Sequence, residues 1–355
     1  MIKRLIPVIL AGALLYALGA CAPAGTSTPT PVPQATAKPE AAAPTPAAKP
    51  TPRPLEKVKI QIPAPAPLYF YLDMGRDKGI FQAEGLDVET IILRSDLAVP
   101  ALLKGEVDYV AMFSGPMKAT LKGEAIKVFM VTTSKADWRL FLGQGLTSIE
   151  QVKGKAVAAA TVAGIDRVAT ERGLKQLGLN TEKDVTFVTL PTYADMLVAL
   201  KSGALGAAAL QSPEIQLARA AGLKEMLDLG DVLPSPIAGV STTTKRIQEN
   251  PDQVKRLIKA ILKSMTYVRD HKEEAAAVAG KVFSQDSEAA KNLLEGSVGG
   301  WAYDGAVTDR SLAAYVDVLK SDQQAGLQNA TVEQMKKGVD YELLAAALKE
   351  LGLSR

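Results

Sequence analysis

Hydrophobic and polar positions divide the chain into three parts. At the start, Lys3 and Arg4 precede an apolar run at 5–18. Residues 22–55 then hold ten of the chain's 21 prolines, and alanine, threonine and serine fill most of the other positions. From residue 56 onward, short apolar runs alternate with amphipathic ones, so we expect the folded body to begin there.

The third part predicts an α/β protein. Val58, Ile60 and Ile62 alternate with polar residues, which is typical of a half-buried strand. Strands separated by helices predict parallel sheets that helices cover on both faces. The other expected strands are 86–93, 107–113, 126–132, 156–160, 185–190 and 207–210, and the expected helices are 68–78, 99–104, 165–177, 193–201, 213–221, most of 251–283, 309–321 and 332–350.

A weak internal repeat predicts two lobes of similar plan. In each of the segments 102–113 and 200–210, a helix end, a glycine and a buried strand follow one another. Both strands then run into a helix start that contains serine and proline, at Ser114 and at Ser212. Because ligands bind beyond the carboxyl ends of strands in such sheets, we expect the two lobes to face each other across a cleft.

The chain's only cysteine lies directly after the first apolar run. A basic start, an apolar centre and small residues are typical of a secretory signal, and the tetrapeptide LGAC at 18–21 resembles the lipobox of bacterial lipoproteins. The resemblance implies that a signal peptide, residues 1–20, is removed and that Cys21 carries a diacylglycerol. The alternatives are a cleaved but unlipidated signal and a plain transmembrane anchor. The anchor is disfavoured, because the run is shorter than the roughly 20 residues that span a bilayer. Residues 21–55 would be the lipidated cysteine and a disordered Pro/Ala/Thr linker.

Composition excludes several classes of function. The formal net charge is only +3, and no basic block with interleaved aromatics indicates nucleic-acid binding. We find no Ser/His/Asp set, metal-ligand cluster or phosphate loop in the sequence, so we expect no catalytic residue, cofactor or metal. His271, the only histidine, lies at a Lys/Glu-rich helix end and is expected to be exposed.

Four motifs in the body resemble those of the solute-binding proteins of ABC importers, of the nitrate/sulfonate/taurine type. The resemblance implies a two-lobed type II periplasmic-binding-protein fold. Lobe 1 would comprise 56–140 and 238–355, and lobe 2 would comprise 145–234, with crossings near 140–146 and 234–239. Gly206 departs from the family, which usually has aspartate there, and we interpret that position as scaffold. The motifs are 79–89 (GIFQAEGLDVE), 103–108 (LKGEVD), 148–155 (SIEQVKGK) and 177–185 (LGL…DV).

The expected ligand site lies where predicted strands end and helices begin. Tyr69 offers an aromatic face and a hydroxyl, although a core position is equally compatible with the pattern. Asp166, in the first turn of the expected helix 165–177, would repel an anion. Arg139 is expected to be a solvated surface residue rather than a partner for an anionic ligand. The candidate ligand-binding residues are Pro65, Tyr69, Ser114 and Gly115 in lobe 1, and Val162, Gly164, Gln211 and Ser212 in lobe 2.

The resemblance implies an extracytoplasmic solute-binding protein. It would be a monomer anchored in the cell membrane by lipid, and would deliver a small polar or heteroaromatic organic solute to the transmembrane subunits of an ABC permease. Sulfonate-like, nitrate-like and vitamin-precursor-like solutes all remain open. The alternatives are a ligand-sensing receptor subunit, or an enzyme on the same fold such as a thiamine-pyrimidine synthase or a porphobilinogen polymerase. Both enzymes need cysteine or histidine chemistry that this chain lacks.

Overall fold

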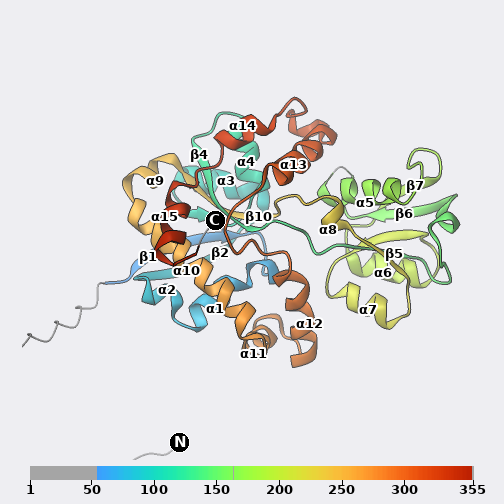
Figure 1. The fold of residues 1–355 in the computed structure, drawn as a ribbon, viewed down its shortest axis with the longest axis horizontal. Helices are drawn as coiled ribbons and strands as arrows, with labels where there is room; N and C mark the ends of the chain where they lie inside the picture. The colour runs from blue at the N-terminus through green and yellow to red at the C-terminus, as the bar shows by residue number, and fades with distance from the viewer. Residues whose placement is uncertain (1–53, 163, 354–355) are drawn as a thin grey trace, which may run out of the picture. The chain divides into compact units, whose positions relative to one another are not determined.

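The computed structural model describes residues 54–162 and 164–353, and two five-stranded sheets organise them (Figure 1). The first sheet has the order β2-β1-β3-β10-β4. Strands β1 and β2 and strands β1 and β3 pair in parallel, whereas β10 runs antiparallel to both β3 and β4. The strands are β1 (Glu56–Ile62), β2 (Leu86–Ile92), β3 (Tyr109–Val110), β4 (Ile126–Thr133) and β10 (Ala238–Thr243).

The second sheet has the order β7-β6-β8-β5-β9, and β5 runs antiparallel to β8 and β9. The prediction of purely parallel sheets is therefore wrong for one strand in each sheet. Both exceptions, β5 and β10, are strands that enter their sheet directly from the other one, so they start at the edge where their neighbours end. The strands are β5 (Arg139–Leu142), β6 (Lys155–Ala159), β7 (Val185–Thr189), β8 (Ala207–Leu210) and β9 (Glu225–Asp228).

Two crossings, residues 134–138 and 233–237, join the sheets. Because β5 belongs to the second sheet, the first crossing falls earlier than the predicted 140–146, and residues 139–140 do not belong to lobe 1. Arg139 at the start of β5 pairs with Leu210 and Asp228, the last residues of β8 and β9. The crossings therefore connect the carboxyl edge of one sheet to the carboxyl edge of the other.

Helices lie between and after these strands. The sequence did not predict α12, and the predicted helix at 251–283 breaks at His271. Around the first sheet lie η1 (Pro67–Tyr69), α1 (Phe70–Asp77), α2 (Ile80–Ala83), α3 (Ser95–Lys104), α4 (Ser114–Leu121), α9 (Thr244–Glu249), α10 (Pro251–Asp270), α11 (Lys272–Phe283), α12 (Ser287–Val298), α13 (Asp309–Ser321), η3 (Gln323–Ala325), α14 (Val332–Lys337) and α15 (Glu342–Glu350). With the second sheet lie η2 (Ile149–Val152), α5 (Ile165–Gln176), α6 (Tyr193–Lys201), α7 (Glu214–Ala220) and α8 (Leu229–Val232).

The predicted single helix at 332–350 is two helices, α14 and α15. Between them the chain pairs with β4: the amide of Val128 donates to Gly338 O (3.0 Å), and the amide of Asp340 donates to Val128 O (3.0 Å). Two hydrogen bonds to a strand edge replace those that a continuous helix would make there. Helical periodicity in the sequence does not show this competition.

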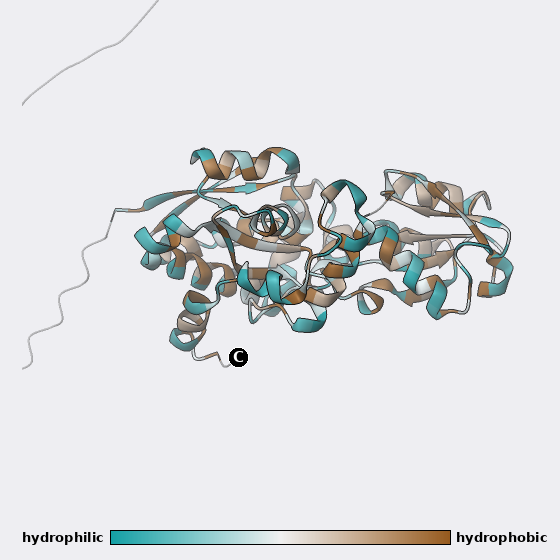
Figure 2. Ribbon diagram, turned by 90° about the horizontal axis from the view of Figure 1, so that it is seen from above, coloured by the Kyte–Doolittle hydropathy of each residue, from teal (hydrophilic) through white to brown (hydrophobic). Residues whose placement is uncertain are grey.

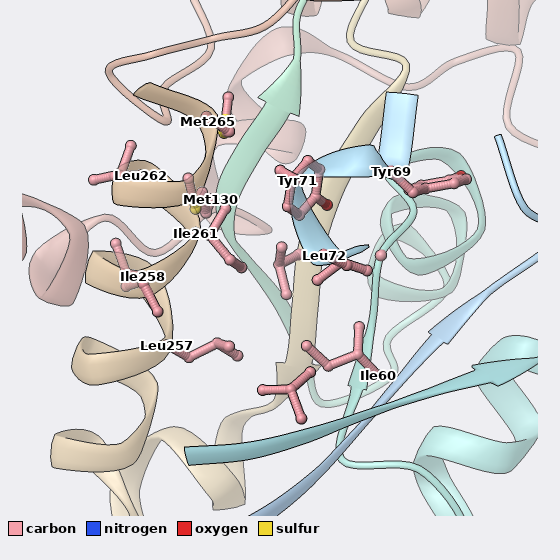
Figure 3. Close-up of a cluster of buried hydrophobic side chains, with 14 of the residues drawn as sticks. Ile60, Tyr69, Tyr71, Leu72, Met130, Leu257, Ile258, Ile261, Leu262 and Met265 are labelled. Atoms are coloured by element: carbon pink, nitrogen blue, oxygen red, sulfur yellow. The ribbon is translucent and has the colours of Figure 1, made fainter. Parts of the chain in front are cut away.

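Helix α10 supplies much of the core of the first lobe, by which we mean the first sheet with its helices. Its residues at 257, 258, 261, 262 and 265 recur on one face and are buried. Figure 3 shows these side chains facing Tyr71, Leu72 and Met130. Hydrophobic and hydrophilic residues alternate along the helices in Figure 2, as expected for helices that bury one face. No helix within 54–162 and 164–353 combines the length and the apolarity that a bilayer crossing needs.

The glycine that departs from the family pattern has a packing role. A Cβ at Gly206 would lie 2.7 Å from Lys155 Cβ and 3.1 Å from Val152 Cγ1. Chain segments at the amino ends of β6 and β8 therefore approach too closely for an aspartate there.

Candidate ligand-binding site

The candidate site lies at the two carboxyl edges that the crossings join. In the first lobe these edges lead into η1, into α4 and into the crossing at 134–138. In the second lobe, the second sheet with its helices, β6, β7 and β8 end just before α5, α6 and α7. Parallel strands bring these helix starts to one side of each sheet, which is where open α/β sheets bind ligands.

Tyr69 ends η1 at the first of these edges. Its ring is 6% exposed and packs in the core around α10, whereas in Figure 3 it extends away from the α10 side chains. Its hydroxyl makes no hydrogen bond with the residues that the structure describes. Burial raises the pKa of Tyr69, and the neighbouring Tyr71 raises it further. The hydroxyl therefore stays protonated and free to donate. The core position of Tyr69 is confirmed, whereas its contact with a ligand stays a prediction.

Other polar groups near the crossings are buried without a partner. Tyr71 lies edge-on to Trp301, with ring centroids 5.8 Å apart, and Trp301 forms an isolated bridge with Thr133. Burial raises the pKa of Tyr71, and the nearby Thr132 hydroxyl, which lies outside hydrogen-bonding geometry, offsets part of that rise. Such groups have capacity for ordered water or a polar ligand. In the described part of the chain the unpartnered groups here are the hydroxyls of Tyr71, Thr132, Thr133 and Ser235 and the indole N–H of Trp301.

Sequence reasoning missed this group. The polar run at 132–134, directly after the apolar strand, was the available signal, but serine and threonine are common at strand ends. Trp301 and Tyr303 both pack against the first lobe, Trp301 against Tyr71 and Tyr303 against the core around α10.

Ser114 and its neighbours make contacts within the first lobe. The Ser114 hydroxyl lies 2.6 Å from the Tyr315 hydroxyl of α13, and the buried Tyr315 ring packs edge-on to Phe113 with centroids 5.2 Å apart. Gly115 is half-buried beside this contact, whereas Pro65 is exposed in the loop before η1. Ser114 retains lone pairs for one more hydrogen bond.

Three amides of the loop before α5 already have partners within the chain. The buried Asp166 carboxylate accepts from the amides of Ala160 (2.6 Å) and Thr161 (3.0 Å) and from the Thr161 hydroxyl. The amide of Gly164 in turn donates to Thr161 Oγ1 (2.9 Å), and Val162 is 76% exposed. A carboxylate of the chain itself thus occupies the place of an anion at this helix start.

The edge that follows β8 has more polar side chains without a partner. Gln211 is half-buried, and its side-chain amide has no partner among the described residues. Ser212 donates to Asp137 Oδ2 (2.6 Å) in the first crossing. Glu214 is half-buried with no basic side chain of the described residues within ion-pair distance, and burial raises its pKa. This edge therefore carries uncompensated negative character.

Basic side chains near the crossings are already paired. Arg139 contacts Asp228 (3.0 Å), Asp137 (3.5 Å) and Glu225 (3.5 Å). Its side chain is 22% exposed, so the expectation of a solvated surface arginine is wrong. Lys135 contacts Asp228 (2.8 Å) and Asp231 (2.6 Å); burial lowers the pKa of Lys135, but these two carboxylates more than offset that effect. Neither cation is free to pair with an anionic ligand.

Two further features lie apart from these edges. A hollow of about 470 Å³ lies at the opposite side of the first sheet, where α3 and β10 end, and its lining includes Asp108 and Arg246, which pair with each other. His271 is exposed, as expected, and stacks on Tyr267 with ring centroids 4.0 Å apart. In the described ranges, no three His, Cys, Asp or Glu side chains converge as a metal site would need.

The predicted site residues are distributed over the two carboxyl edges. Tyr69 and Ser114 lie at the first edge, and Gly164, Gln211 and Ser212 at the second. Of these, Ser212 contacts the crossing, and Tyr69 and Gln211 keep unpartnered groups. Trp138 in the crossing donates to Tyr193 Oη of the second lobe (3.0 Å). Cys21 lies outside the described residues.

Solved structures of low sequence identity share this fold. The periplasmic aliphatic sulphonate-binding protein of Escherichia coli aligns with a TM-score of 0.62 at 15% identity, over 80% of this chain and 92% of the other. The periplasmic nitrate-binding protein of a Synechocystis strain aligns with a TM-score of 0.59 at 15% identity, over 84% and 89%. The periplasmic-binding-protein fold is therefore confirmed.

Sequence comparison identifies relatives as well. A Brucella abortus protein that is provisionally described as a binding protein is 23% identical over an alignment of 247 residues, and the match covers 63% of this chain and 76% of the relative. The family model described as NMT1/THI5 like matches residues 67–275, more than half of the chain. The chain belongs to the NMT1/THI5-like family.

Proposed function

We propose that this protein is an extracytoplasmic solute-binding protein that captures a small organic molecule and delivers it to an ABC permease. The observation that carries the proposal is the pair of carboxyl edges that two short crossings connect, with unpartnered polar groups on both sides. Two lobes on such a hinge can close on a ligand that contacts both. The sulphonate- and nitrate-binding proteins that share the fold support this proposal.

The charge distribution favours a neutral or N–H-bearing solute over a free anion. Arg139 and Lys135 are paired within the protein, Asp166 takes the loop amides, and Glu214 lacks a cation. An anion beside these groups would therefore be desolvated without a free positive partner. Arg167 at the start of α5 lies over the Phe187 ring and 3.9 Å from Glu171. We propose a polar or heteroaromatic organic ligand, held by hydroxyl and amide groups that include Tyr69, Ser114 and Gln211.

The function is tested by what the protein carries and whether it changes it. Mass spectrometry of small molecules released from denatured, freshly purified protein should identify a solute. Adding that solute to ligand-free protein should reduce the radius of gyration in small-angle scattering, and the solute should be recovered intact. Recovery of a converted product would show an enzyme instead.

The ligand site is tested by removing single polar groups. Tyr69→Phe and Gln211→Ala should each weaken binding of the recovered solute by roughly 5- to 150-fold, which corresponds to one lost buried hydrogen bond of about 1–3 kcal/mol. Neither variant should lower the melting temperature of the ligand-free protein, because neither group has a partner in the described fold. Isothermal titration calorimetry and a thermal melt measure both quantities.

Two controls separate contact with ligand from damage to the fold. Gln216→Ala removes the same kind of side chain from α7, the helix that follows Gln211, and should bind the solute normally. Tyr69→Ala should unfold more readily, by roughly 3–5 kcal/mol, because it empties part of the core. Normal binding by both Tyr69→Phe and Gln211→Ala would place the site elsewhere.

A further inference from the structure

Gly296 lies where the first lobe, the second lobe and a crossing meet. It is an interior residue of α12, a helix of the first lobe. A Cβ at this position would lie 2.7 Å from Ser212 Oγ of the second lobe and 2.8 Å from Cγ of Asp137 in the first crossing, and closer still to Asp137 Oδ2. Real Cβ atoms do not approach other atoms so closely, so only glycine allows this contact.

The helix itself would prefer another residue. Glycine inside a helix is less stable than alanine, since it loses more backbone entropy on folding. Gly299, three residues later, has helical backbone angles, and a Cβ there would come no closer than 3.6 Å to any neighbour. The steric demand for glycine at position 296 is therefore not shared by Gly299, and it arises from the approach of the second lobe and the first crossing.

The obstacle that a methyl group would meet is held in place. Asp137 accepts a hydrogen bond from Ser212 (2.6 Å) and lies 3.5 Å from Arg139. Its side chain is only 7% exposed. Moving this carboxylate aside would break its hydrogen bond to Ser212, so a methyl group at position 296 favours displacement of α12 or of the second lobe.

We propose that Gly296, Asp137 and Ser212 form a contact point that determines how closely the two lobes approach, and that they position the ligand-binding groups without touching the ligand. The importance of that position for affinity rests on the proposed binding function. A variant that holds the lobes apart lowers the population of the binding-competent state, and the apparent dissociation constant rises by the same factor, about tenfold if a tenth of the molecules still close.

The test measures the distance between lobes and needs no ligand. In full-length Cys21→Ser protein, whose other residues include no cysteine, spin labels are placed at the exposed positions Leu97 of α3 and Val198 of α6. Double electron–electron resonance should show longer and broader distances for Gly296→Ala than for the parent. The matched control Gly299→Ala should reproduce the parent distribution.

Two more variants keep the test decisive. Ser212→Val adds bulk at the same point from a loop of the second lobe, so it should lengthen the distances even if Gly296→Ala disturbs α12. Adding Asp137→Ala to Gly296→Ala removes the fixed carboxylate and should restore shorter distances. Parent-like distributions in both Gly296→Ala and Ser212→Val would overturn the contact point, and this result is independent of whether the protein binds a solute.

Discussion

Full-length protein carrying Cys21→Ser is expected in the soluble fraction after cell breakage, whereas the parent chain is expected with the membranes. The thiol is the only attachment point for a diacylglycerol, because the chain has one cysteine. Each buried methylene of an acyl chain contributes about 0.8 kcal/mol, so a residue with two or more chains is firmly anchored and its loss is decisive.

The measurement is fractionation with a carbonate wash, together with the mass of the N-terminal peptide. Cys21→Ser combined with Ser27→Cys is the matched control: it restores a thiol outside the LGAC motif and should remain soluble. Retention of Cys21→Ser in the membrane would refute lipid anchoring at this residue.

Asp228→Ala should cost about 2–4 kcal/mol of unfolding free energy, the largest expected effect near the crossings. Asp228 contacts both Lys135 (2.8 Å) and Arg139 (3.0 Å) and also accepts from the amide of Gly230 (2.9 Å) at the start of α8. The variant removes a helix cap and leaves two partly buried cations with weaker pairing. Urea unfolding followed by circular dichroism measures the loss.

Asp231→Ala serves as the matched comparison. Asp231 pairs with Lys135 alone, and its side chain is 71% exposed, so its removal should cost no more than about 1 kcal/mol. Equal losses in the two variants would mean that Asp228 contributes as a surface charge and that the charge cluster does not stabilise the crossings.

Much of the fold follows from local pattern. The helices at 193–201 and 309–321 and the strand at 207–210 have the predicted bounds, because their apolar spacing and flanking turn residues agree with their tertiary surroundings. The basic, apolar and small-residue order before Cys21 is equally local, since a secretory signal is defined by consecutive residues.

Candidate site residues were only partly predictable. The start of α4 at Ser114 and the edge at Gln211 and Ser212 follow from helix-start signals after strands. The partner of each group does not: Tyr315 is 201 positions from Ser114 in sequence, and Asp137 is 75 positions from Ser212. For Tyr69, the sequence pattern predicted the helix start. It could not show whether the ring is buried in the core or whether the hydroxyl lacks a partner.

The sequence by itself determined the α/β class, the repeated lobe plan and the family resemblance, since each depends on residues that are near neighbours along the chain. Only the tertiary structure decided that β5 belongs to the second sheet, that a strand contact divides α14 from α15, that Arg139 is paired internally and that Gly296 meets the second lobe. Each of these depends on competition between a local preference and a contact with a distant segment. Local spacing carries no information about the distant partner, so the outcome appears only when the chain is folded.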